Sequence, residues 1–151
     1  ERTVTMHSRF DRPYPPGKVQ VNGAAYPASV SGDLAFTWRH RDRTQQTAYL
    51  VLQTENSIGP EAGTTYTLRL YTAGGVLKRT YSGLTGTSQA YSNAQEIADF
   101  GAVQGALRFE LESLRDGLAS YQKHSIWVYR TLILTVADTE SVVAVDAVTL
   151  A

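Results

Sequence analysis

Apolar and polar residues alternate along several short segments of the chain, and turn residues separate these segments. In the clearest segment, Leu34, Phe36 and Trp38 share one face, and a shift of the strand by one residue would expose all three. The segments with this pattern are Val4–Phe10, Lys18–Asn22, Leu34–Trp38, Tyr66–Tyr71, Val76–Tyr81, Leu107–Glu112 and Tyr121–Arg130. Seven or more short strands, with turn signals about every 8–12 residues, predict an antiparallel β-sandwich.

The spacing of apolar residues changes once, between Ser92 and Phe100, from the alternation of a strand to the spacing of a helix. Ser92 is followed three residues later by Gln95, which is the spacing of a capping box, and Gly101 is a typical residue to end a helix. We therefore expect one short helix in an otherwise all-β chain.

Glycine and proline mark the predicted turns. Gly74–Gly75 and Asp116–Gly117 each predict a hairpin turn, whereas the three prolines within Pro13–Gly17 predict a stiff extended connector. The long polar stretch Arg39–Gly63 is predicted either to add an edge strand at Tyr49–Leu52 or to pack on a neighbouring chain, because structureless loops of this length are rare.

The connector divides the chain into a β flank at 1–12, a central module at 13–130 and a β-rich flank at 131–151. Thr131–Ala137 and Val142–Leu150 are rich in β-branched and small apolar residues and carry few charges, so alone they would present adhesive edges. We expect them to pair with Glu1–Phe10 or with copies in other subunits.

Composition narrows the classes of partner. The 151 residues include 14 basic and 14 acidic side chains, a formal net charge of 0, and no cysteine. Balanced charge argues against duplex DNA or an anionic bilayer, and the lack of thiols excludes disulfides, thiolate zinc sites and a cysteine nucleophile. No apolar run approaches the roughly 20 residues of a membrane span, so no membrane insertion is expected. Residue 1 is Glu rather than Met, and Glu1–Phe10 lacks the features of a signal peptide, so we expect either a processed product or the ordered part of a longer protein, and favour the second.

Residues suited to catalysis do not form a recognisable constellation. The sequence lacks the nucleophile elbow, the phosphate-binding loop and the zinc-binding His-Glu-x-x-His motif, and its three histidines lie in different segments: His7, His40 and His124. Glu110 and Glu112 share a strand face as a glycosidase pair would, but Arg108 shares it too, which favours a solvated charged face. We predict that the chain is not an enzyme and holds no metal or cofactor.

A basic run follows Trp38, but it does not predict nucleic-acid binding. Stacking on a base would require an exposed ring, whereas alternation with Leu34 and Phe36 places Trp38 in the core. Asp42 also interrupts the run.

The order of these strands resembles a fibronectin type III module. The phrases Pro15–Val19, Gly32–Trp38 and Tyr66–Tyr71 carry the resemblance, which covers Pro13 to Arg130. It implies an antiparallel β-sandwich with the tryptophan of the second strand in the core, and a fifth strand that begins near Leu84. The expected fold is therefore fibronectin type III-like, with one short helix and flanking β segments.

A closer resemblance is to a subset of these modules in structural proteins of tailed-bacteriophage tails. Four phrases in the same order carry it: Arg12–Gly17, Trp38–Thr47, Gly83–Ser88 and Ser113–Gly117. The resemblance implies a virion protein of the tail tip or tail fibre that mediates subunit assembly and attachment to the host. The implied partners are other phage tail proteins, further copies in a trimer, and a receptor on the host cell surface.

The fibronectin-like order places the loop after Trp38 and the turn at Asp116 at the same end of the sandwich. The charged residues that would meet there form a candidate interaction patch: Arg39, Arg41, Asp42, Arg43, Arg115 and Asp116. Arginine suits protein interfaces because its planar fork makes bidentate bonds. The alternative is a solvated loop with local Arg–Asp pairs, each worth little.

A second hypothesis from another class is an accessory carbohydrate-binding or adhesion module of a secreted bacterial protein. A sugar site needs exposed aromatic side chains on one face, and alternation places Trp127, Tyr129 and Tyr71 away from the core positions.

Overall fold

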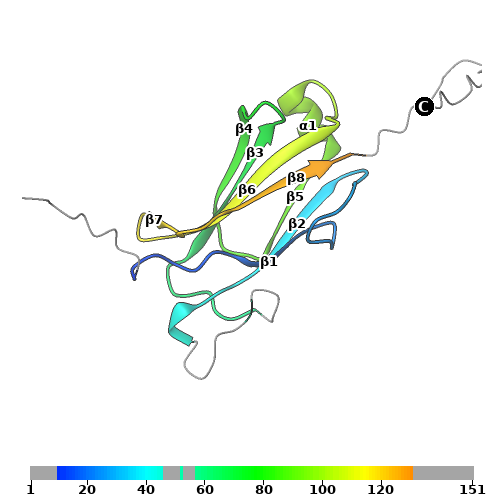
Figure 1. Ribbon diagram of the computed structural model, residues 1–151. Coiled ribbons are helices and arrows are strands. Elements are labelled where there is room, and N and C mark those ends of the chain that lie inside the picture. The colour runs from blue at the N-terminus through cyan, green and yellow to red at the C-terminus, as the bar shows by residue number, and fades with distance from the viewer. Residues whose placement is uncertain (1–9, 46–51, 53–56, 131–151) are drawn as a thin grey trace, which may run out of the picture.

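Two antiparallel β-sheets face each other in the computed structural model, which describes residues 10–45, 52 and 57–130 (Figure 1). In chain order the elements are β1 (Gly17–Val21), β2 (Leu34–Arg39), the 3₁₀ helix η1 (Arg43–Gln45), β3 (Thr65–Thr72), β4 (Leu77–Leu84), β5 (Ser88–Tyr91), α1 (Asn93–Phe100), β6 (Ala106–Arg115), β7 (Leu118–Ala119) and β8 (His124–Tyr129).

The first sheet has three strands in the order β1-β2-β5. Its central strand β2 buries Leu34, Phe36 and Trp38 and exposes Ala35 and Arg39, as the alternation predicts. Strand β5 pairs with β2 from Leu34↔Tyr91 to Thr37↔Ser88.

The second sheet has five strands, in which the long strand β6 is central. Strand β3 pairs with β6 over eight residues, from Thr65↔Leu114 to Thr72↔Leu107, and β4 pairs with the other side of β3. The remaining side of β6 is shared, since β8 pairs with its first half and the short β7 with its last two residues.

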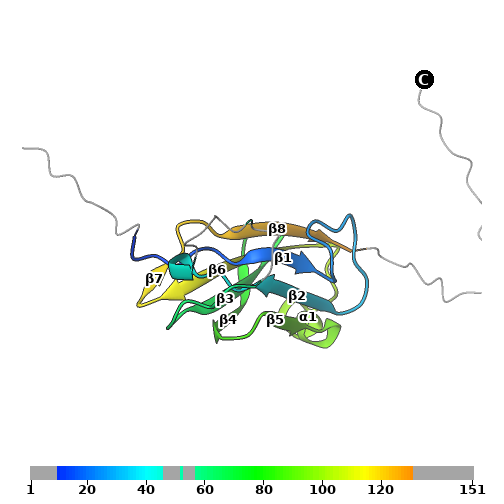
Figure 2. The same cartoon turned by 90° about the horizontal axis from the view of Figure 1, so that it is seen from below.

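Apolar side chains from both sheets form one core. Figure 2 shows the strands that carry them, seen from below. Phe36 of the first sheet lies 4.7 Å from Phe109 of the second, ring centre to ring centre, and Trp38 lies 5.5 Å from Tyr66. The chain is therefore a fibronectin type III-like antiparallel β-sandwich, and the core position predicted for Trp38 is confirmed.

Helix α1 begins and ends where its caps predict. The Ser92 hydroxyl accepts a hydrogen bond from the Gln95 N–H at 3.2 Å, and the Gln95 side chain accepts one from the Ser92 N–H at 3.0 Å. Gly101 takes the left-handed conformation that closes the helix.

Two strand boundaries differ from expectation. Leu84 ends β4 instead of beginning the fifth strand, which starts at Ser88 after the chain crosses between the sheets. The crossing is fixed by a hydrogen bond from the Trp38 N–H to the Thr87 carbonyl at 2.9 Å. The predicted strand Tyr121–Arg130 is shorter, beginning at His124. The predicted flank 131–151, residues 1–9 of the predicted flank 1–12, and most of the predicted edge strand Tyr49–Leu52 lie outside the described residues.

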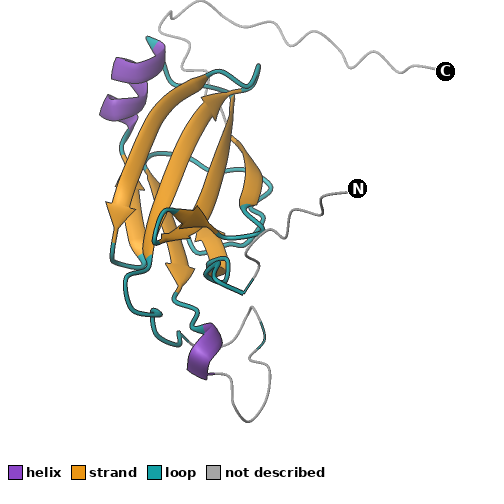
Figure 3. Cartoon of the chain, turned by 90° about the vertical axis from the view of Figure 1, so that its left-hand side faces the viewer, coloured by secondary structure: helices purple, strands orange, loops and turns teal. Residues whose placement is uncertain are grey.

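The described chain enters at one end of the sandwich and leaves β8 at the other (Figures 1 and 3). We call the first of these the loop end; it comprises the connector Pro13–Pro16, η1 and the turn between β6 and β7. At the opposite end lies α1.

Candidate functional site

At the loop end, the loop after β2 and the turn between β6 and β7 meet through Glu61, a residue that the sequence pattern does not reveal. Glu61 is 6% exposed and precedes β3. Its carboxylate accepts hydrogen bonds from Arg43 Nε, at 2.9 Å to each oxygen, and from Arg115 Nη1. Arg115 also pairs with Asp116 at 3.3 Å. Two of the six predicted patch residues, Arg43 and Arg115, therefore meet on one buried carboxylate, and a third, Asp116, is joined to them through Arg115.

The other three predicted residues occupy different environments. Arg39 is exposed at the end of β2, whereas Arg41 and Asp42 are buried, at 9% and 4% exposure. Arg41 and Asp42 of the predicted patch therefore lie largely inside the loop. Alternation does not extend past β2, so the sequence carries no indication of which loop side chains turn inward.

Asp42 organises the start of the loop. Its carboxylate accepts hydrogen bonds from the Thr44 N–H at 2.7 Å, the Thr44 hydroxyl at 2.6 Å and the Gln45 amide at 2.8 Å, which fixes η1. Burial raises the pKa of Asp42, but these hydrogen bonds outweigh it and hold the pKa below its ordinary value. Asp42 is therefore an internal anchor of the loop.

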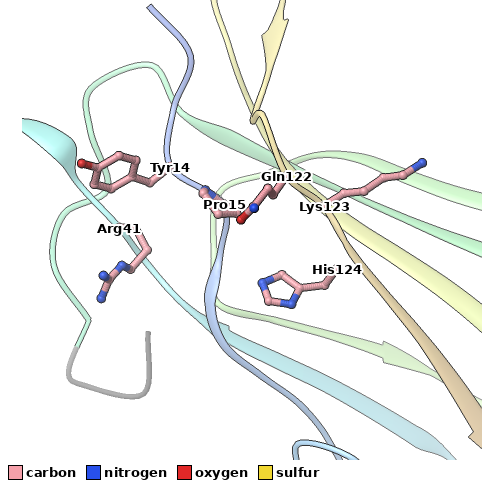
Figure 4. Close-up of a pocket in the computed structure, with 6 residues that line it drawn as sticks. All are labelled: Tyr14, Pro15, Arg41, Gln122, Lys123 and His124. Carbon is pink, nitrogen blue, oxygen red and sulfur yellow. The ribbon is translucent and has the colours of Figure 1, made fainter. Parts of the chain in front are cut away.

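A groove of about 520 Å³ opens beside this loop (Figure 4). It is lined by Tyr14, Pro15, Arg41, Gln122, Lys123 and His124. Figure 4 shows His124 pointing toward the connector, while the Lys123 side chain extends away from the others. The Lys123 ammonium pairs with Glu110 at 2.8 Å, and Arg41 donates to the Leu52 carbonyl at 2.8 Å. Both cations at this groove are therefore already oriented by neighbouring groups.

A second groove, of about 960 Å³, continues from the first, since Tyr14, Pro15 and Gln122 line both. It adds exposed aromatic side chains, with Phe10 at 89% and Tyr121 at 67% exposure. The remaining residues that line it are Arg12, Pro13, Arg43 and Thr44. The two grooves together form one surface, which we call the groove surface, rich in aromatic rings and arginine.

The connector is held against the second sheet by two hydrogen bonds. The Arg12 guanidinium donates to the Ala119 carbonyl at 2.8 Å, and His124 Nε2 donates to the Pro16 carbonyl at 2.7 Å. Burial lowers the pKa of His124, although the Pro16 carbonyl opposes the shift. A neutral ring suits this position because one nitrogen donates while the ring stays partly buried.

A second histidine stabilises the base of the loop. His40 Nδ1 lies 2.8 Å from the Tyr66 hydroxyl, and the two rings are stacked at 28° with centres 5.6 Å apart. Burial lowers the pKa of His40 and raises the pKa of Tyr66 to about 12. The pair is therefore uncharged near neutral pH and fixes the end of β2 against β3.

The acidic pair on β6 is held by ion pairs. Glu110 accepts from Lys123 at 2.8 Å, Tyr71 at 3.0 Å and Arg108 at 3.2 Å, while Glu112 accepts from Arg69. Burial raises the pKa of Glu110, but the hydrogen bonds from Lys123 and Tyr71 bring it below its ordinary value. A general acid of a glycosidase requires the opposite shift, so the geometry does not suit Glu110 to that role. The strand face is charged as predicted, but Glu110 is 5% exposed and is held by ion pairs instead of being solvated.

The described residues contain no group of three or more His, Asp or Glu side chains placed to hold a metal ion. In the same part of the chain, no helix is both long enough and apolar enough to cross a bilayer.

Comparison with known proteins adds little to this picture. No protein-family model matches the sequence, and no curated protein matches it. Among solved structures, the chain is similar to the PKD domain from the human VPS10 domain-containing receptor SorCS2, with 15% sequence identity and a TM-score of 0.40. That match covers 87% of this chain and 84% of the other. The strand order and the shared core described above are those of an antiparallel β-sandwich.

Proposed function

We propose that the chain is a structural interaction module of a phage tail, in the tail tip or a tail fibre, that contacts neighbouring subunits through the groove surface. The observation that carries the proposal is the concentration of aromatic and arginine side chains there. Phe10, Tyr14 and Tyr121 surround the second groove together with Arg12 and Arg43.

This composition is typical of protein–protein contacts. Aromatic residues and arginine are enriched at interfaces, because they bury a large area and keep a polar group for hydrogen bonding. Arg43 is held by Glu61, so part of its side-chain entropy is already lost before a partner binds. The surface is thus shaped and partly ordered in advance.

The resemblance to phage tail modules supports the finer assignment. Three of its four phrases contribute to the loop end: Arg12–Gly17 forms the connector, Ser113–Gly117 the β6–β7 turn, and Trp38–Thr47 includes η1. Residues of Arg12–Gly17 and Trp38–Thr47 therefore line the groove surface, whereas Ser113–Gly117 lines neither groove. Other tail proteins are the proposed partners, and a receptor on the host surface is a further one.

Entry and exit of the described chain at opposite ends suit a spacer in a larger assembly. Such a module sets the distance between the elements attached at its two ends, while the groove surface binds it to a neighbouring subunit. The virion is the proposed location.

Electron microscopy of purified particles tests the location. A gold-labelled antibody against the chain is expected to bind at the tail, and the chain is expected to copurify with infectious particles. Absence of the chain from purified virions would refute the proposal.

A variant pair tests the surface. Phe10→Ser combined with Tyr121→Ser is expected to reduce incorporation into particles by at least about tenfold, because buried aromatic anchors dominate interface energies. Tyr26→Ser is the matched control, since Tyr26 is 79% exposed in the loop between β1 and β2 and lines neither groove. Equal incorporation of both variants would count against the groove surface as the contact.

Oligomeric state tests the proposed trimer. Light scattering of the complete chain is expected to give three times the mass of 16.6 kDa calculated for one copy. A monomer at high micromolar concentration would contradict self-association through this chain alone.

A further inference from the structure

The outer face of the second sheet carries a row of residues that the groove surface does not include. Tyr71 of β3, Arg108 of β6 and Trp127 of β8 are direct neighbours across three strands. Tyr129 follows two positions later on β8, on the same side of the sheet. We call these four residues the aromatic row.

The aromatic rings of β8 are exposed and held by a well-paired backbone. Trp127 is 42% exposed and Tyr129 is 52% exposed, and their ring planes differ by only 16° with centres 6.4 Å apart. Strand β8 pairs with β6 over six residues, and the Val30 N–H donates to the Tyr129 carbonyl at 2.8 Å on its other side. Little ordering entropy would therefore be lost if these rings bound a ligand.

Polar side chains border the rings and are already oriented. The Arg108 guanidinium lies 4.4 Å from the centre of the Tyr71 ring, and it also pairs with Glu110. Glu110 in turn holds Lys123 and the Tyr71 hydroxyl. The row thus combines aromatic faces with hydrogen-bonding groups whose positions are fixed by their neighbours.

Each of the named charges on this face has a partner of opposite sign. The two carboxylates, of Glu110 and Glu112, pair with three cations, Arg69, Arg108 and Lys123, which leaves one excess positive charge. Because every one of these cations is already paired, the face complements an uncharged polyhydroxylated ligand better than an anion or a cation.

We propose that the aromatic row binds a neutral oligosaccharide. The C–H groups on one side of a sugar ring carry partial positive charge and pack on the negative face of an aromatic ring. Hydroxyl groups at the ring edge then reach the Arg108 guanidinium, which Glu110 orients, as in sites where a few placed polar groups fix the orientation of a ligand. This site does not depend on the proposed role in a phage tail.

A protein partner fits this face less well. Interface anchors usually insert into pockets, whereas the two grooves described above are lined by neither Trp127 nor Tyr129. Stacking on a sugar requires an aromatic ring. An aromatic substitution on β8 should therefore preserve sugar binding, whereas an aliphatic substitution should abolish it. A protein contact that depends on apolar area would tolerate the aliphatic one.

Tryptophan fluorescence provides a direct measurement on the complete chain. Of the two tryptophans, Trp38 is 2% exposed, so quenching by acrylamide reports chiefly on Trp127. The probes are neutral oligosaccharides of glucose, mannose, galactose and N-acetylglucosamine, at concentrations up to the millimolar range. We expect at least one of them to shield Trp127 from acrylamide.

Substitutions on β8 distinguish ring stacking from a contact that needs only apolar area. Trp127→Leu, and independently Tyr129→Leu, are expected to weaken binding of that probe by at least about tenfold in calorimetry, whereas Trp127→Tyr retains binding within a few-fold. Tyr26→Leu, on another surface, is the control and leaves binding unchanged. Circular dichroism checks that each variant folds.

Two results would overturn the proposal. One is the absence of binding by every neutral probe; the other is binding that survives both leucine substitutions. In the second case the oligosaccharide would bind elsewhere on the chain. Neither result bears on the tail location, which the microscopy tests separately.

Discussion

Position 59, in the loop before β3, requires glycine both because of its backbone conformation and because neighbouring atoms leave no room for a Cβ. Its φ of +94° lies in the left-handed region, and a Cβ there would stand 2.8 Å from the Asp42 Cβ and 2.9 Å from the Glu61 nitrogen. We expect Gly59→Ala to lower the free energy of unfolding by about 2–4 kcal/mol, because a backbone penalty of about 1–2 kcal/mol adds to steric overlap. Urea unfolding measures the loss.

Gly75 is the matched control for this substitution. Its φ is +84°, but nothing lies within 4 Å of the position that its Cβ would take. Gly75→Ala should therefore show only the backbone penalty, about 1–2 kcal/mol. A loss as large as that of Gly59→Ala would mean that close packing against Asp42 contributes nothing.

The pair of Glu96 and Arg130 is an ion pair inside the protein, with the two side chains 0% and 2% exposed. Arg130 also donates to the Gly32 carbonyl, and Glu96 accepts from the Gln104 N–H at 2.7 Å. We expect Glu96→Gln to cost about 3–5 kcal/mol in chemical unfolding, because it leaves a buried guanidinium without a counter-charge. Glu96→Leu combined with Arg130→Met should recover most of that loss, and a double variant less stable than the single one would contradict this expectation.

The burial and contacts of single side chains in loops are the hardest features to predict from the sequence. The meeting of Arg43 with Arg115 and Asp116 follows from the predicted loop positions, but Glu61, which links the two arginines, lies in a stretch without hydrophobic period. Alternation reports which side of a strand faces the core, and it contains no information on long-range contacts between loops. The burial of Arg41 is unpredictable for the same reason.

Helix α1 is the element that local signals determine most fully. Its capping box and its terminal glycine are all within the segment from Ser92 to Gly101. Replacing the cap by Ser92→Ala is expected to cost about 1 kcal/mol in thermal or urea unfolding, because the Gln95 N–H loses its acceptor. Ser82→Ala, at an exposed position of β4, should leave stability within about 0.5 kcal/mol. Equal effects at the two sites would exclude a capping role.

Strands are predictable as segments, but their sheet membership is not. The pattern around Leu68 and Leu70 identifies β3, since strict alternation requires one buried face. The crossing from β4 to β5 depends on where the chain leaves one sheet for the other, and that is decided by tertiary hydrogen bonds such as that from Trp38 to Thr87. The boundary predicted at Leu84 is therefore wrong, although the strands on either side of it are present.

At the scale of the whole molecule, two separate surfaces carry the two proposed functions, a subunit contact and oligosaccharide binding. The groove surface lies at the loop end, where the described chain enters, whereas the aromatic row lies on the outer face of the second sheet. Both rest on a core that β-strand alternation predicts. The division of roles is consistent with a rigid sandwich that positions functional side chains from its loops and one sheet face.

Stability of the whole molecule should fall in two steps as the pH is lowered. Burial lowers the pKa of His40 and His124 below the ordinary 6.5, so between 6.5 and the folded pKa the unfolded chain binds more protons than the folded one. Folding is then favoured fully above about pH 6.5 and progressively less below it. Because both rings are partly solvated, we expect a loss of about 1 kcal/mol, or a few degrees in Tm, between about pH 7.5 and 5.5.

The second step has its origin in carboxylates. Hydrogen bonds from Arg79 lower the pKa of Asp99 below its ordinary 3.8, so the stability that this ion pair provides is lost as the pH falls below about 4. Calorimetry from pH 8 to pH 3 should show a plateau, a shallow decline and then a steep one. His124→Gln is expected to flatten the shallow decline and to leave the steep one in place. A Tm that rises between pH 7 and 5.5 in the unsubstituted protein would show that the buried histidines gain rather than lose protons on folding.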